Sequence, residues 1–209
     1  MTASTPGFRV GLVQMRSGRT PAQNVDAATK LIKEAKSGGA DYVLTPEMTN
    51  ILERKREDLF AAIATEEKDR SLPDFRDLAR RLGIWVHVGS LAIEVLPQKA
   101  VNRSFLIDPK GDIAARYDKI HMFDVDLAGG ESYRESGSFR PGELAVAVDL
   151  PWGRVLAEGG TEPGVIFADV DPSQVAIVRA RIPSLQHGRR FEVVEPIAEP
   201  SHLHVVKSS

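Results

Sequence analysis

The sequence predicts one layered domain of the α/β or α+β class, for two reasons. Stretches typical of strands and helices alternate in the first half of the chain, and pairs of strands joined by short turns follow. Of the 209 residues, 42% are hydrophobic and 27% are charged, which suits a globular protein with one sizeable core. No low-complexity segment or change of composition marks a linker, so residues 1–209 are expected to form a single domain.

The first part of the chain predicts two strands around a helix. Residues 8–15 are apolar and β-branched enough for a buried strand. Thr20 and Pro21 are typical of an N-cap and a first helical residue, and Gly38 with its neighbouring glycine is typical of a helix end. Apolar residues at helical spacing lie between them: Val25, Ala28, Leu31, Ile32 and Ala35. Residues 41–46 then predict a second strand.

The middle of the chain predicts a helix and three more strands. A helix is expected over 73–82, with Gly83 as its end. Residues 84–93 predict a strand, and 101–107 and 113–120 predict two strands joined by an Asp-Pro-Lys-Gly turn.

The last part of the chain has weaker patterns. Residues 145–156 predict a second strand–turn–strand unit around a Pro-Trp-Gly turn, and 165–170 predict a strand. Asp171 and Pro172 are typical of a helix start, with apolar positions at Val175, Val178 and Ile182. Residues 195–209 show little periodicity and are expected to be a loose tail.

Composition excludes several classes of function. The net charge of -2 gives no broad field of one sign that would attract nucleic acid or anionic lipid. Residues 1–7 do not resemble a signal peptide, and no apolar stretch is long enough to span a membrane, so a cytoplasmic protein is expected. Cysteine is absent, which excludes disulfides and thiolate metal sites, and the histidines lack ligand spacing. We therefore expect no metal and no organic cofactor.

Three motifs follow one another along the chain. The first is Thr45-Pro46-Glu47 at a strand end, the second is the run from Arg116 through Lys119 to Asp124, and the third is Glu135 shortly before Phe-Arg-Pro-Gly. An Asn-x-Ser strand beginning at Asn102 lies between the first two. Together, and in this order, they resemble the nitrilase (carbon–nitrogen hydrolase) superfamily, close to its Nit-type amidase branch. The resemblance covers residues 8 to 192.

The resemblance implies a fold and a site. The fold would be a four-layer α-β-β-α sandwich, and the site a Glu-Lys-Cys triad that hydrolyses the C–N bond of a small amide. Glu47 would be the general base, with a pKa raised toward neutral by a dry pocket, and Lys119 would stabilise the oxyanion. Glu135 would be a second carboxylate that positions Lys119 or the substrate. Without the resemblance, Glu47 is an ordinary strand-end carboxylate and Lys119 a solvated lysine.

The resemblance breaks near residue 153. In the family, the cysteine follows a strand that is entered through a turn like Pro151-Trp-Gly, and a second such turn comes much later. Here this turn runs directly into the sequence that normally follows the second one, and there is no cysteine anywhere. We hypothesise an in-frame internal deletion that leaves the sandwich incomplete. A wrongly assembled gene sequence would leave the same trace.

Two functions remain open. By descent, the chain would hydrolyse a small amide, such as an ω-amide or a compound like deaminated glutathione, but without the cysteine it is predicted to be inactive. Alternatively, it is a non-catalytic remnant that binds a ligand, associates with itself, or joins an intact homologue as a subunit. In either case Glu47 and Lys119 are expected to meet at neighbouring strand ends and line a pocket.

Overall fold

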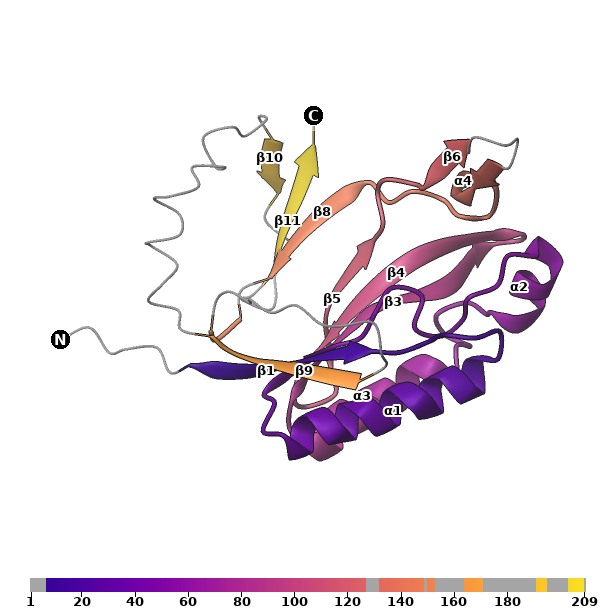
Figure 1. Ribbon diagram of the computed structural model, residues 1–209. Helices are drawn as coiled ribbons and strands as arrows, with labels where there is room; N and C mark the ends of the chain where they lie inside the picture. The colour runs from indigo at the N-terminus through magenta and orange to yellow at the C-terminus, as the bar shows by residue number, and fades with distance from the viewer. Residues whose placement is uncertain are drawn as a thin grey trace.

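The computed structural model describes residues 7–126, 132–148, 150–152, 164–170, 191–194 and 203–208. Their main element is a six-stranded mixed sheet in the order β5-β4-β3-β2-β1-β9, with helices along one face (Figure 1). Its strands are β1 (Phe8–Gln14), β2 (Tyr42–Leu44), β3 (Trp85–Leu96), β4 (Lys99–Ile107), β5 (Ile113–Asp118) and β9 (Gly164–Val170). The pairs β1–β2 and β2–β3 are parallel, whereas β3–β4, β4–β5 and β1–β9 are antiparallel.

Two helices bury their apolar stripes against this sheet. They are α1 (Pro21–Ser37) and α3 (Ser71–Leu82), which contact each other and the strands beneath them. Gly83 ends α3 in the left-handed conformation with a φ of 63°, as the sequence predicts for a terminating glycine. The resulting core includes Val25, Ala28, Ile32, Val43, Phe75, Leu78, Val86 and Phe105.

The opposite face of the sheet is covered by a second, smaller sheet. Its order is β10-β11-β8, with β10 (Phe191–Val194), β11 (Leu203–Ser208) and β8 (Leu144–Val148). Residues of β8 pack on an apolar cluster that contains Phe8 and Tyr42. The ring of Trp152 stacks on Phe8 with 4.8 Å between the centroids. Helix layer, sheet and second sheet are thus three of the four expected layers, and the described residues show no helix over the second sheet.

Most of the predicted elements are confirmed, with differences that have physical causes. The strands predicted over 84–93 and 101–107 are longer and form one hairpin, because their extended residues pair across a tight turn at Gln98. The tail expected to be loose contains β11, whose β-branched residues pair with β8 and β10. The predicted strand at 155–156 and the helix after Asp171 lie outside the described residues.

Two short helices were not predicted, α2 (Arg56–Ala62) and α4 (Glu135–Ser138). In α2, only Leu59 is buried. One buried position in seven residues gives no apolar periodicity, so the sequence pattern does not predict this helix. Its conformation depends instead on the packing of Leu59. Among the described residues, no helix combines the length and the apolar character that crossing a membrane requires.

A partly buried pair between β2 and β3 should make the fold sensitive to acid. The hydroxyl of Tyr42 lies 2.6 Å from Nδ1 of His87, and burial lowers the pKa of His87 below its ordinary 6.5. A neutral buried histidine costs stability when it must be protonated. This contribution is therefore present above pH 6.5 and is lost as the pH falls from there through the lowered pKa.

We expect the free energy of unfolding to fall between pH 7.5 and pH 5.5, and to fall less in His87→Gln. Urea denaturation at both pH values measures the difference. His121 is exposed, so His121→Gln is the matched control and should keep the wild-type pH dependence. Equal pH dependence in the wild type and His87→Gln would contradict this assignment.

Candidate active site

The loop after β2 carries Glu47 and is held against β3. The amide of Gly89 donates to Oγ1 of Thr45 at 3.1 Å, and the amide of Met48 donates to Oγ of Ser90 at 2.8 Å. Met48 has a φ of 54°, in the left-handed region that a non-glycine residue rarely adopts. The contacts from β3 hold this strained turn in place, and they fix the direction in which Glu47 leaves the backbone.

A glycine in β3 allows the loop to approach. A Cβ atom at Gly89 would lie 2.6 Å from the carbonyl oxygen of Pro46 and closer still to that of Thr45. Real Cβ atoms do not reach such distances, and backbone cannot move aside as a flexible side chain can. β3 therefore requires glycine at the position beneath Glu47.

Gly89→Ala should destabilise the protein by roughly 1–3 kcal/mol or more, because the loop carrying Glu47 must lift off β3. The measurement is the urea midpoint of unfolding at constant m-value. Gly137→Ala is the control, since a Cβ there would meet nothing within 4 Å. Indistinguishable midpoints for Gly89→Ala and the wild type would show that the loop yields without cost.

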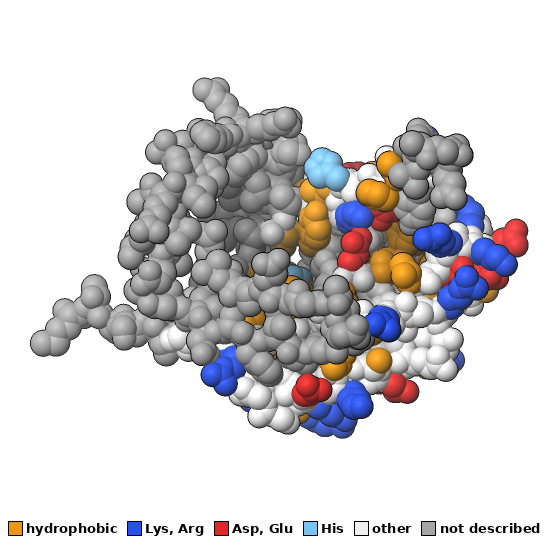
Figure 2. Space-filling view, in the orientation of Figure 1, with side chains coloured by type: hydrophobic (Ala, Val, Ile, Leu, Met, Phe, Trp, Pro, Cys, Tyr) orange, Lys and Arg blue, Asp and Glu red, His pale blue; other side chains and the backbone are white. Residues whose placement is uncertain are grey.

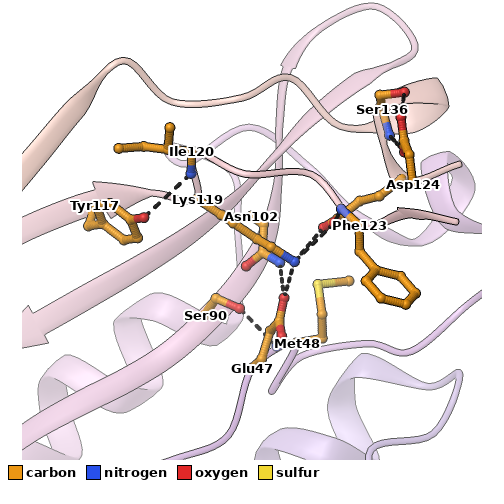
Figure 3. A network of polar contacts seen from close by, with 11 residues as sticks. Glu47, Met48, Ser90, Asn102, Tyr117, Lys119, Ile120, Phe123, Asp124 and Ser136 are labelled. Carbon is orange, nitrogen blue, oxygen red and sulfur yellow. Dashed lines mark hydrogen bonds and ion pairs between the residues drawn. The ribbon is translucent and has the colours of Figure 1, made fainter. Parts of the chain in front are cut away.

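Lys119 follows the last residue of β5, and hydrogen bonds hold both its backbone amide and its backbone carbonyl. Its amide donates to the carbonyl of Asn102 at 2.9 Å, and its carbonyl accepts from the amide of Gly142 at 2.9 Å. Its Nζ lies 2.9 Å from Oε1 of Glu47 and 2.9 Å from Oε2 of Glu135. Lys119 therefore links the two carboxylates that sequence analysis singled out, and Figure 3 shows its side chain pointing at Glu47.

Glu135 is the buried member of this cluster. It begins α4 (Glu135–Ser138), directly after a small sheet of β6 (Asp124–Asp126) and β7 (Ser132–Arg134). The residue is 6% exposed, and the amide of Phe123 donates to Oε2 at 2.6 Å. A buried carboxylate needs such partners, and here they are one backbone amide and the ammonium of Lys119.

Asn102 is a member of the site that sequence analysis did not select. It lies on β4, is 3% exposed, and its Nδ2 donates to Oε1 of Glu47 at 2.6 Å. A polar amide directly after the apolar residues Ala100 and Val101 was the signal that could have found it, because buried polar groups have partners. Asn102 thus connects the strand between β3 and β5 to the carboxylate after β2.

Two expectations about this site are wrong in their detail. β2 and β5 are not neighbours, because β3 and β4 lie between them. Lys119 reaches Glu47 because its side chain is long and both residues follow strands that run in the same direction. The pKa of Glu47 is not raised: partial burial raises it, but hydrogen bonds from Lys119 and Asn102 outweigh burial and leave the pKa below its ordinary value.

The dry pocket behind that expectation is not found around Glu47. Its side chain is 57% exposed, and that of Lys119 is 28% exposed. For Lys119, partial burial lowers the pKa, but Glu135 and Glu47 outweigh it and raise the pKa, which keeps the ammonium charged. Two cavities of about 440 and 390 Å3 lie elsewhere, by the start of α3 and by Arg103, and neither is lined by Glu47 or Lys119.

The surroundings of the site are open to solvent. Phe123, whose amide holds Glu135, is 59% exposed, and it lies beside Met48 and Glu47 in Figure 3. On the described part of the face that Figure 2 shows, hydrophobic side chains lie beside acidic and basic ones. Among the described residues, no group of three or more His, Asp or Glu side chains is arranged to hold a metal ion.

Comparisons with known proteins give this geometry a context. The family model described as "Carbon-nitrogen hydrolase" matches residues 9–150. A deaminated glutathione amidase of Yersinia enterocolitica is 37% identical over 150 residues, which is 70% of this chain and 51% of that protein. A solved amidase from Nesterenkonia sp. AN1, which has an active site cysteine, is 26% identical to this chain with a TM-score of 0.58. That match covers 70% of this chain and 54% of the other.

The length of the matches bears on the missing segment. The chain spans about half the length of the curated relatives named first among its matches. A longer alignment with an omega-amidase of Pongo abelii is 22% identical over 264 residues and covers 87% of this chain and 95% of that protein. Since 87% of 209 residues is 182, about 82 of the 264 aligned positions have no residue here. Together these unmatched positions amount to a substantial part of that protein.

Proposed function

Because the chain belongs to the carbon–nitrogen hydrolase family, we propose that it carries the acid–base and oxyanion-binding half of an amidase site without the nucleophile. One observation carries the proposal: Nζ of Lys119 lies 2.9 Å from each of two carboxylates, Glu47 and Glu135, in a chain that contains no cysteine. The sequence thus retains groups that move protons and stabilise charge, but lacks the atom that would attack the amide.

The three side chains suit different tasks. Glu47 is exposed enough to meet a substrate or water and is ionised because its pKa is lowered, so it can accept a proton. Lys119 is kept charged by its raised pKa, as a group that binds an oxyanion must be. Glu135 is buried behind Lys119 and would hold the ammonium in place rather than react.

We propose that an internal deletion next to residue 153 removed the nucleophile. The alignment gap of about 82 positions supports a loss of that size, and the exposed Phe123 is expected of a site that lacks part of its wall. The substrate class by descent would be a small amide, because the relatives are named as amidases of deaminated glutathione and of ω-amides. A subunit role beside an intact homologue is the alternative function. DNA sequencing across codons 150–158 distinguishes a true deletion from an error in the assembled gene sequence.

A graft tests whether the retained half still works. The segment of the Pongo abelii relative that has no counterpart here would be inserted after Trp152, and ammonia release from short ω-amides would be measured. We expect activity in the graft, and none when Glu47→Gln is added or when the inserted cysteine is replaced by alanine. A graft that unfolds cooperatively on heating yet releases no ammonia would contradict the retained catalytic geometry.

A further inference from the structure

Asn102 contacts both catalytic side-chain positions at once. Its Nδ2 donates to Oε1 of Glu47 at 2.6 Å, and its backbone carbonyl accepts from the amide of Lys119 at 2.9 Å. The residue itself is 3% exposed and is paired in register with Ala92 on β3. Asn102 therefore holds Glu47 through its side chain and the backbone of Lys119 through its carbonyl.

The two donors converge on one oxygen of Glu47. Nζ of Lys119 lies 2.9 Å from Oε1, the same atom that accepts from Asn102. Among the described residues, none donates a hydrogen bond to Oε2 of Glu47, and this side chain is 57% exposed. The two carboxylate oxygens are therefore unequal: Oε1 is occupied and Oε2 is free to take a proton.

We propose that Asn102 is a positioning residue that turns the Glu47 carboxylate so that Oε2 is the proton-accepting atom. The inference rests on the proposed function, because it names the orientation of the base in that same site. Lys119 alone would not fix the orientation, since an ammonium group donates in several directions from a flexible stem. A planar amide on a rigid strand defines one direction, and its bond to an ionised acceptor is of the strong, charge-assisted kind.

The test follows protonation of Glu47 in the intact chain by NMR. The carboxyl-carbon signal of Glu47 is titrated in the wild type, Asn102→Leu and Asn102→Asp. We expect the pKa of Glu47 to shift upward in Asn102→Leu, because a donor to the ionised form is lost, and further upward in Asn102→Asp, which replaces the donor by an acceptor. Ser104→Ala is the matched control: Ser104 lies on the same strand and donates to the carbonyl of Gly89, so the pKa of Glu47 should not change.

A second measurement needs no change at Asn102. The side-chain amide signals of Asn102 in the wild type should titrate with the pKa of Glu47, and this titration should vanish in Glu47→Gln. The inference is overturned if the amide signals do not change when Glu47 ionises, or if the pKa of Glu47 is unchanged in both Asn102 variants.

Lys119→Met separates this failure from that of the proposed function. If Lys119→Met raises the pKa of Glu47 while the Asn102 variants do not, only the role of Asn102 is wrong. If neither change affects Glu47, the ion cluster itself does not form, and the proposed function fails with it.

Discussion

Purified protein of this sequence should release ammonia from short ω-amides and nitriles at the rate of a blank. Glu47 can accept a proton and Lys119 can stabilise an oxyanion, but neither supplies the attacking atom. In triad enzymes, loss of the nucleophile costs about six orders of magnitude in kcat, and the remaining rate comes from binding and the oxyanion site. The proposed deletion also removes the backbone that would complete an oxyanion hole after the nucleophile, so that remainder should shrink further.

The one route to activity is a water molecule activated directly by Glu47. It requires a substrate held in line within hydrogen-bond reach of the carboxylate. Among the residues that the structure describes, the open surroundings of Glu47 and Phe123 provide no wall to hold one. Ammonia release is therefore measured for the wild type and Glu47→Gln in parallel, and turnover that is lost in the variant would show that water replaces the cysteine. Equal rates at the blank level are the expected result.

The first half of the fold could be predicted from sequence because its signals are local. α1 and α3 have apolar residues at helical spacing and glycine at their ends, and β1 is a mostly apolar strand. The order of the strands could not be predicted, because it depends on which faces pack once all elements exist. The same limit explains why α2 was missed, where a single buried leucine decides the conformation.

For the candidate site as well, the sequence indicated residues but not their geometry. Glu47 and Lys119 were found by their motifs, although 72 residues separate them. Their spacing across two intervening strands depends on the twist of the sheet and the length of a lysine. The direction of the Glu47 pKa shift was missed because hydrogen bonds from Lys119 and Asn102 outweigh partial burial, and both depend on how the strands are arranged.

Lys119→Met should destabilise the fold strongly, because it leaves a buried carboxylate without its counter-charge. Glu135 is 6% exposed, and only the amide of Phe123 would remain among the partners described for it. Removing one partner of a buried ion pair typically costs roughly 3–5 kcal/mol. The lower end of that range is expected, since the side chain of Lys119 is 28% exposed and water can reach the space it leaves.

A double-mutant cycle isolates the cause of this loss. Lys119→Met, Glu135→Gln and the double variant are compared by urea denaturation, with Lys110→Met, an exposed lysine in the turn after β4, as the control. We expect the double variant to be more stable than Lys119→Met alone, because burying a neutral amide at this position costs less free energy than burying an unpaired carboxylate. Additive losses in the cycle would show that Lys119 stabilises the fold through the packing of its stem, and that the charge of Glu135 is not what holds it.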